Sequence, residues 1–422
     1  MPPLSAIGIS GLQVGEDVKK NRMPALHDPT TLRIAVISDL HAYAESSEPH
    51  PSYLKVLGTS DSAAVDPVRH LEELIDTQGL KADLLLSPGD LGDKASSEGI
   101  KYAWKCLHEI GKRLKTHLVA ASSGNHDLDS RHLDFSSDPT ETLQRLVPSY
   151  PLPNDADNNQ YWARKFVVKT TENYRLAILN SSAYHGGKPE EIEYGRISNF
   201  TIERLKKELG GISHAPPVNI ALCHHHPHQF PEISQEDDTC DVMKNGQKLL
   251  NLIGNGQNGD WIVIHGHKHH ARIAYAQGGN SSPVVMGAGS FSAALYLEIQ
   301  SEARNQFYLI ELPLNNQSGL VGTIRAWDWT QRGWMPANNR SGLPAVCKFG
   351  CRDSVTKLAH RIDQLLGERK TENWKEMLVS IPEVEFLLPD DLDTLINRLG
   401  EQYKIKVERE NGILKELGRK TR

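Results

Sequence analysis

Six short hydrophobic runs punctuate the first three quarters of the chain, with polar stretches between them. They are rich in β-branched residues and bounded by turn-forming residues, and this pattern predicts buried strands. Runs that are hydrophobic along their whole length are typical of strands covered on both faces. They span residues 32–38, 82–87, 117–123, 175–181, 218–223 and 260–265.

Helical patterns lie between several of these runs. In residues 66–79, Asp66 is placed to cap a helix, Pro67 suits its first turn and Gly79 suits its end. Residues 99–115 repeat hydrophobic positions at the 3.6-residue spacing of an amphipathic helix. The alternation of strands and helices predicts an α/β core.

The pattern changes in the last third of the chain. Residues 283–291, 305–313 and 320–329 are strand-like with no convincing helix between them, so we expect hairpins there and not one purely parallel sheet. After about residue 352, hydrophobic residues return to helical spacing. The three expected parts are an N-terminal extension (1–30), a main domain (31–345) and a C-terminal helical region (346–422).

Composition bears on the class of protein and its compartment. The chain has 422 residues and a formal net charge of −6, which gives no overall basic surface for nucleic acid. Its beginning lacks the pattern of a secretion signal, and no stretch reaches the roughly 18 apolar residues of a membrane span. The five cysteines are an odd, scattered set, which favours a reducing compartment. We expect a cytoplasmic protein without membrane contact.

Residues of metal-ligand type follow five of the six predicted strands. They are Asp39 and His41, Asp90, Asn125 and His126, His224, His225 and His226, and His265, His267 and His269. In α/β proteins the carboxyl ends of the strands form one rim, where ligands bind. We therefore expect these side chains, which are far apart in the sequence, to meet at that rim.

The spacing within these motifs suits a pair of metal ions. Asp39 and His41 are two positions apart, so both side chains can face one side, and the same holds for His267 and His269. Asp90 has two oxygens and can bridge two ions that are about 3.5 to 4 Å apart. Because the other ligands are neutral histidine and asparagine, the site keeps a net positive charge that attracts a phosphate ester.

The order of these motifs, D-x-H, G-D, G-N-H-D, H-H-P and G-H-x-H, resembles the calcineurin-like metallophosphoesterase superfamily over roughly residues 30 to 300. One such motif is weak evidence, whereas five in the family's order are specific. The resemblance implies an α/β fold with a two-sheet β-sandwich core flanked by helices, and the pattern adds a small C-terminal helical region. It also implies two divalent metal ions (Mn, Fe or Zn) and hydrolysis of phosphate esters by a metal-bound hydroxide.

Carried over position by position, the resemblance implies a role for each motif residue. One metal would be held by Asp39, His41, Asp90 and His269. The other would be held by Asp90, Asn125, His225 and His267. His126 would be the catalytic residue that protonates the leaving group, and Asp127 is expected to orient it.

Two choices among the histidines rest on the family spacing. The two-residue spacing alone would also admit His265 as a ligand. The G-H-x-H pattern instead selects the two histidines after Gly266. The conformational freedom of this glycine is expected to allow a tight turn. The H-x-P spacing selects His225, two positions before a proline, and leaves His224 and His226 as alternatives.

The function expected from these features is that of a phosphodiesterase acting on a nucleotide or another small diester. The alternatives are a nuclease on single-stranded DNA or RNA, a phosphomonoesterase, and a metal-binding interaction module without catalysis. Arg131, just after the third motif, and Arg196, after a flexible glycine, are candidate substrate-binding residues. The C-terminal helices are expected to mediate oligomerisation or to bind a protein partner.

Overall fold

The computed structural model of the chain describes residues 26–44, 50–56, 66–130, 136, 138–185, 194–211, 215–228, 242–295, 299–301, 303–315, 319–330, 332–338, 341–410 and 413–419. Arg131, one of the two arginines expected to bind substrate, lies outside these residues. Of the expected N-terminal extension, residues 26–30 are described, and they lead directly into the first strand.

One sheet contains seven strands in the order β12-β11-β10-β1-β2-β3, with β13 paired to β11. β1, β2 and β3 run parallel, whereas β10 is antiparallel to β1 and forms the expected hairpin with β11. The strands are β1 (Thr31–Val36), β2 (Leu84–Ser87), β3 (Leu118–Ala121), β10 (Gln306–Pro313), β11 (Gly322–Thr330), β12 (Gly333–Pro336) and β13 (Val346–Phe349).

The second sheet contains six strands in the order β4-β5-β6-β7-β9-β8. β5, β6, β7 and β9 are parallel. The segment near residues 283–291, which was expected to continue the later hairpins, therefore belongs to this sheet instead, as a parallel neighbour of β7. The strands are β4 (Phe166–Thr170), β5 (Tyr174–Leu179), β6 (Val218–Leu222), β7 (Trp261–His265), β8 (Arg272–Tyr275) and β9 (Val284–Gly287).

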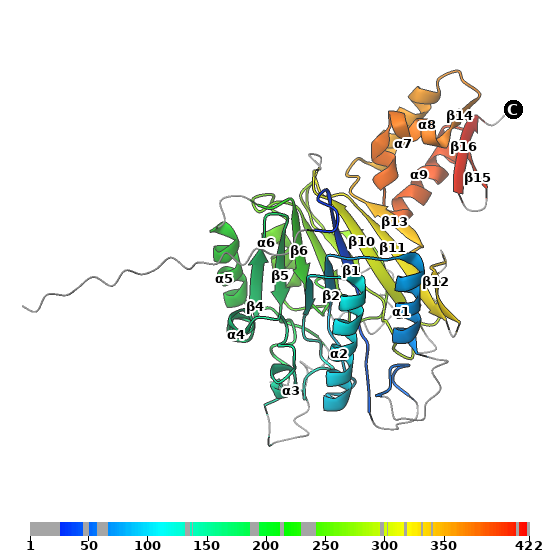
Figure 1. Cartoon of the computed structure of the whole chain (residues 1–422). Helices are drawn as coiled ribbons and strands as arrows, with labels where there is room; N and C mark the ends of the chain where they lie inside the picture. The colour runs from blue at the N-terminus through cyan, green and yellow to red at the C-terminus, as the bar shows by residue number, and fades with distance from the viewer. Residues whose placement is uncertain are drawn as a thin grey trace, which may run out of the picture.

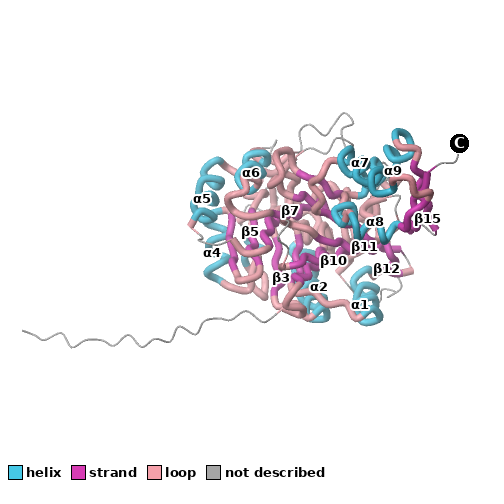
Figure 2. Tube along the Cα trace, turned by 90° about the horizontal axis from the view of Figure 1, so that it is seen from above, coloured by secondary structure: helices cyan, strands magenta, loops and turns pink. Residues whose placement is uncertain are grey.

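The two sheets pack against each other, and helices cover their outer faces (Figures 1 and 2). In the six-stranded sheet, Ile220 and Ile262 belong to the core that both sheets share, while their neighbours Ala221 and Val263 belong to a second core beneath α5 and α6. This alternation follows from the two-residue repeat of a strand. The α/β sandwich flanked by helices is confirmed. Helices α5 and α6 span Asn199–Gly210 and Gly246–Ile253.

The helices over the seven-stranded sheet begin and end where their sequence predicts. In α1 (Pro67–Gln78), the Asp66 carboxylate accepts two backbone N–H groups, and Gly79 ends the helix with a left-handed φ of 61°. Helix α2 (Ser97–Leu114) packs beside α1 (Figure 1). Two shorter helices lie between β3 and β4, namely α3 (Glu141–Gln144) and α4 (Asp155–Arg164).

The C-terminal region has a hydrophobic core of its own, formed by residues between Cys351 and Leu417. The expected helices are present, but the region also contains a three-stranded sheet that the helical pattern did not predict. β14 has only three residues and charged residues occupy much of β15, so neither contains a hydrophobic run. The elements are α7 (Val355–Leu366), β14 (Thr371–Asn373), α8 (Trp374–Ser380), the 3-10 helix η5 (Pro382–Phe386), α9 (Pro389–Gln402), β15 (Ile405–Glu410) and β16 (Ile413–Arg419).

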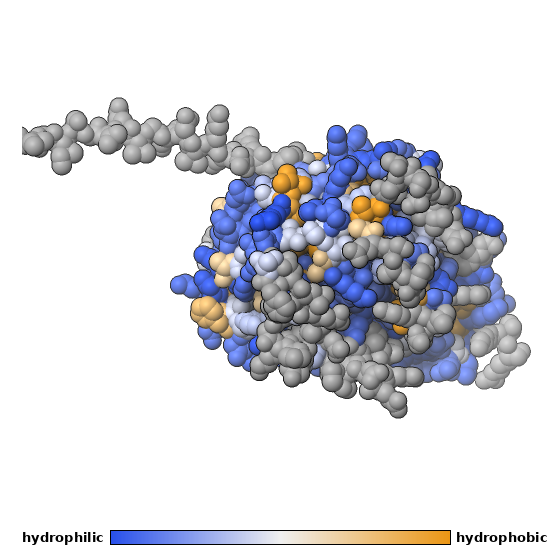
Figure 3. Space-filling model, turned by 90° about the horizontal axis from the view of Figure 1, so that it is seen from below, coloured by the Kyte–Doolittle hydropathy of each residue, from blue (hydrophilic) through white to orange (hydrophobic). Residues whose placement is uncertain are grey.

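The surface is mainly hydrophilic where it can be seen from below, with hydrophobic residues in small separate groups (Figure 3). Within the described ranges, no helix combines the length and the apolar character that crossing a bilayer requires.

Candidate metal centre

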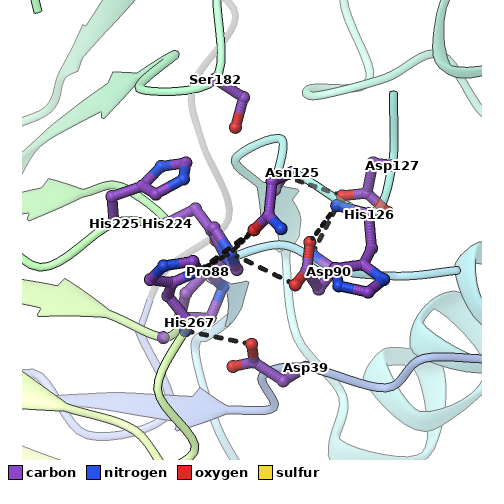
Figure 4. A network of polar contacts seen from close by, with 12 residues as sticks. Asp39, Pro88, Asp90, Asn125, His126, Asp127, Ser182, His224, His225 and His267 are labelled. Carbon is purple, nitrogen blue, oxygen red and sulfur yellow. Dashed lines mark hydrogen bonds and ion pairs between the residues drawn. The ribbon is translucent and has the colours of Figure 1, made fainter. Parts of the chain in front are cut away.

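The parallel strands β1, β2, β3, β6 and β7 end at one rim, and their carboxyl ends bring together side chains from five separate segments (Figure 4). Each motif begins within a few residues of its strand, so the strand fixes where the backbone turns. The side chains are largely buried: Asp39 and His224 are 0% exposed and Asp90 is 1% exposed. Charged groups withdrawn from water in this way need partners or a bound ion.

One group of donor atoms lies around Asp39, His41 and His269. The Nε2 atoms of His41 and His269 are 3.1 Å apart. His269 Nε2 is 3.6 Å from Asp39 Oδ1, and His41 Nε2 is 3.6 Å from Asp90 Oδ2. Nitrogen and oxygen donors from two distant segments therefore converge, and His41 lies beside one oxygen of Asp90.

A second group surrounds the Nε2 atom of His224. This atom is 3.0 Å from Asn125 Oδ1, 3.2 Å from His267 Nδ1 and 3.3 Å from Asp90 Oδ2. His267 Nδ1 is in turn 3.1 Å from Asn125 Oδ1. The same oxygen, Asp90 Oδ2, thus borders both groups and is placed to bridge two ions.

The spacing and chemistry of these donors fit divalent cations. Two donors that each lie about 2.1 Å from one ion are about 3 to 3.5 Å from each other, which is close to the 3.0 to 3.6 Å that separate donors in the two groups. The Nδ1 atom of His224 lies 3.2 Å from the carbonyl oxygen of Pro88, which can only accept a hydrogen bond. In its neutral form, His224 would keep its proton on Nδ1 and direct the Nε2 lone pair at Asn125 Oδ1, and either a second proton or a metal ion at Nε2 removes that repulsion.

His225, the residue selected by the H-x-P spacing, lies beside the second group. Its Nδ1 atom is 2.9 Å from Ser181 Oγ, and its ring centroid is 4.6 Å from that of His267. His224, His225 and His267 together offer three nitrogen atoms within 4.8 Å of one another. Of the two adjacent histidines, His224 contacts Asn125 and Asp90, as Figure 4 shows.

The turn after β7 differs from expectation in how its backbone bends. Gly266 is not among the residues with a left-handed φ, whereas His267 and His269 have φ of 82° and 56°. The glycine is needed for space, because a Cβ atom there would lie 2.3 Å from Asp39 Oδ2 and from Ser38 Oγ. The strained conformations belong to the donor residues, as is common at functional sites.

The same backbone feature recurs in the other donor segments. Asp39, His41 and Asp90 have φ between 49° and 52°, a backbone conformation that residues other than glycine rarely adopt. Hydrogen bonds hold these segments to one another. Asp127 accepts the backbone N–H groups of Asp90 and Leu91 at 2.9 and 2.6 Å. Its carboxylate therefore fixes the loop after β2 and is not the partner of His126.

The partner of His126 is Asp93, a residue that the motif analysis missed. His126 Nδ1 is 3.0 Å from Asp93 Oδ1, and His41 Nδ1 is 3.6 Å from the same oxygen. The available signal was the second aspartate of the run G-D-L-G-D at residues 89–93. Burial opposes ionisation of Asp93, but its contacts with His126 and His41 outweigh this and hold its pKa below the usual range.

Of the two candidate substrate-binding arginines, Arg196 is the one whose position is described. Its guanidinium lies 4.7 Å from the centroid of the Tyr184 ring, and its backbone N–H donates to the carbonyl of Ser181. Because Ser181 contacts His225, Arg196 lies near the second donor group.

Comparison with known families agrees with this geometry. A family model described as calcineurin-like phosphoesterase matches residues 32–280, which is more than half of the chain. The chain belongs to the calcineurin-like phosphoesterase family. A second model, wHTH-Calcineurin_assc, matches residues 347–401 of this phosphoesterase, within the C-terminal region. A search of curated proteins finds no match.

Several solved structures are similar to this chain at low sequence identity. PhoD is 8% identical, with 76% of this chain and 74% of that chain covered and a TM-score of 0.41. A putative 5′-nucleotidase from Staphylococcus aureus is 14% identical, with 69% and 52% covered and a TM-score of 0.39. GAP50, the anchor in the inner membrane complex of Plasmodium, is 13% identical, with 70% and 84% covered and a TM-score of 0.37.

The ionisation of the phosphoesterase site also suits metal binding. Burial lowers the pKa of His267 and His269 well below the usual range, so no proton competes for their nitrogens at neutral pH. Burial also disfavours a charge on His224, but Asp90 and Asp39 outweigh it and raise its pKa to about 9. A proton on His224 then balances the carboxylates, and a bound cation would replace it.

Proposed function

We propose that this protein is a metal-dependent phosphodiesterase that acts on a nucleotide or another small diester. The observation that carries the proposal is the pair of donor groups on either side of Asp90 Oδ2. Membership of the phosphoesterase family supports the reaction class. The overall negative charge disfavours the alternative of a nuclease that holds a long strand by its phosphates.

We assign the donor atoms to two ions. Asp39, His41, Asp90 and His269 would hold the first ion. Asp90, Asn125, His224 and His267 would hold the second, with His224 in the place that the H-x-P spacing assigns to His225. When bound, two divalent ions activate water as a nucleophile and offset the negative charge of the phosphate. Imidazole, carboxylate and amide donors suit Mn, Fe or Zn.

His126 is the proposed general acid. Its side chain is 31% exposed, so a substrate can reach it, whereas the donor residues Asp39, Asp90 and His224 are buried. Burial disfavours a charge on His126, but Asp90 and Asp93 outweigh this and raise its pKa. The imidazolium can therefore hold a proton near neutral pH and pass it to the leaving oxygen, while Asp93 keeps the ring oriented through Nδ1.

The test is hydrolysis of bis-p-nitrophenyl phosphate by the full chain. We expect activity to disappear with EDTA and to return with added Mn²⁺. Asp90→Asn should abolish it, because both donor groups lose a shared charged oxygen. His126→Ala should lower turnover with both metals still bound. Failure to hydrolyse this diester with Mn, Fe and Zn would contradict the proposal, and faster hydrolysis of p-nitrophenyl phosphate would favour the monoesterase.

The C-terminal region is the proposed site of protein contacts. Its separate core supports treating residues 346–422 as a domain of its own. Helix α9 carries Asp390 and Asp391 in its first turn, and this charge would repel a nucleic-acid backbone. We therefore favour a protein partner or a second copy over nucleic acid.

The four described cysteines are free and buried, which supports a cytoplasmic location.

A further inference from the structure

The carboxyl end of β5 borders the metal centre, although no family motif follows this strand. β5 is a parallel neighbour of β6, so its end reaches the same rim. Ser181, just beyond β5, contacts His225 Nδ1 at 2.9 Å. The ring of His185 lies 5.1 Å from the ring of His225. A sixth segment therefore lines the side of the centre where the second donor group lies.

A second segment, residues 194–197, closes this side of the rim. The backbone N–H of Arg196 donates to Ser181, and the N–H of Lys244 donates to Gly195, both at 2.8 Å. Gly195 lies so close to His225 that a Cβ atom there would be 2.4 Å from the imidazole ring. The backbone of this segment is thus held directly against the histidine layer that surrounds the second donor group.

Two cations and two aromatic rings occupy this border. The Arg196 guanidinium lies 4.7 Å from the centroid of the Tyr184 ring, and Lys244 Nζ lies 4.2 Å from the centroid of the Tyr194 ring. Tyr184, Tyr194 and Arg196 are half-buried and Lys244 is exposed, in contrast to the fully buried His225 beneath them. Water and solutes can therefore reach this set, which we call the tyrosine border.

We propose that the tyrosine border binds the nucleoside part of a nucleotide ester whose phosphate lies at the metal centre. This inference rests on the proposed function and names its substrate class. A tyrosine ring or an arginine guanidinium offers a flat surface on which a base stacks. The positive charges of Arg196 and Lys244 add an attraction for phosphate oxygens. An ester with a small aliphatic group would gain from the attraction for phosphate oxygens but not from stacking of a base.

The test compares two diesters with the same leaving group, thymidine 5′-(p-nitrophenyl phosphate) and methyl p-nitrophenyl phosphate. We expect the wild-type protein with Mn²⁺ to prefer the thymidine ester by about tenfold in kcat/KM, because stacking of one base contributes on that scale. Tyr184→Leu and Arg196→Gln should remove most of this preference, mainly through a higher KM for the thymidine ester. Circular dichroism and Mn content would establish that both variants are folded and loaded.

The matched control is Arg204→Gln, since Arg204 also lies over an aromatic ring, Phe200, at 5.1 Å, but on helix α5. It should leave the preference unchanged. Equal kcat/KM for the two esters in the wild type, or equal losses on both in the variants, would overturn the inference. If neither ester is hydrolysed, the proposed diesterase function fails, and calorimetry with thymidine 5′-monophosphate decides the inference. If thymidine 5′-monophosphate binds and Arg196→Gln weakens this binding, nucleoside binding at the tyrosine border is supported. If it does not bind, the inference is refuted.

Discussion

Two adjacent histidines in the loop after β6 have different surroundings despite their identical chemistry. His224 directs Nε2 at Asn125 and Asp90, whereas His225 directs Nδ1 at Ser181. A nitrogen among several oxygen and nitrogen donors is placed to bind an ion, and one beside a serine hydroxyl is anchored by it. The two residues should therefore contribute unequally to metal binding.

We predict that His224→Ala reduces the bound Mn from two ions to one per chain and lowers hydrolysis of the diester by at least about 100-fold, because losing a ligand should cost more than the roughly 10- to 100-fold lost with a residue that only supports one. His225→Ala should keep more of both, because the contacts of His224 remain. Inductively coupled plasma mass spectrometry of the purified proteins measures the metal content. The reverse order of the two variants would return the ligand role to His225.

Asp93 should act by positioning His126. Its carboxylate accepts from His126 Nδ1 at 3.0 Å and favours the imidazolium, which raises the pKa of His126. Asp93→Asn removes that charge, so the pKa of His126 should fall, and activity that needs the protonated ring should be lost at lower pH. The measurement is the alkaline limb of the kcat/KM profile against pH, which should move to lower pH.

Asp93→Glu provides the control for that prediction, because it keeps the charge and should retain the position of the alkaline limb better than the amide. If Asp93→Asn lowers kcat/KM equally at every pH and the alkaline limb stays at the same pH, Asp93 has only a structural role.

The loops that leave the strands are held in conformations that the donor residues themselves do not favour. Asp39, His41, Asp90, His267 and His269 all have positive φ. Such conformations cost about 1 kcal/mol or more each and persist where neighbouring segments hold them. The hydrogen bonds from the loop after β2 to Asp127 are one such restraint.

At the scale of these loops, we predict that Gly266→Ala disrupts the first donor group. The added Cβ would meet Asp39 Oδ2 and Ser38 Oγ at 2.3 Å, and relief of that contact must move the Asp39 carboxylate or the loop after β7. Hydrolysis of the diester should fall by at least tenfold, with less Mn bound. Gly210→Ala, where nothing lies within 4 Å of the new Cβ, should keep wild-type activity.

At the scale of the whole molecule, removal of metal should lower thermal stability. Asp39 and Asp90 are buried among loops from both sheets, and divalent ions compensate their charges more fully than the proton on His224 does. Because the ions bind the folded state, Mn²⁺ at 100 times its Kd should add about 2.7 kcal/mol to the free energy of unfolding for each ion bound. Differential scanning calorimetry of EDTA-treated and Mn-loaded protein measures this as a change in Tm.

Asp90→Asn should show a smaller increase in Tm with Mn²⁺ than the wild type, since its donor groups share one charge fewer. If Mn²⁺ leaves the Tm of the wild-type protein unchanged, the donor groups do not bind this ion in the folded state.

The same scale explains which parts of the fold could be predicted. The buried strands and helix α1 follow from local patterns, because hydrophobic spacing and caps such as Asp66 act within a few residues. The strands of the C-terminal region lack such a pattern, since β15 is largely charged and pairs with β16 through the backbone. The pairing of β9 with β7 also depends on contacts between strands, so the hydrophobic pattern of the segment that contains β9 could not show that this pairing is parallel.

The sequence by itself determined the main buried strands, helix α1, the motifs at the strand ends and therefore the types of atom that gather at the rim. Only the tertiary structure decided that His224 contacts Asn125 and Asp90, that Asp93 pairs with His126, and that the end of β5 borders the centre. The physical reason is that hydrophobic pattern acts along the chain. The direction of a side chain in a turn depends instead on contacts with segments that are distant in sequence.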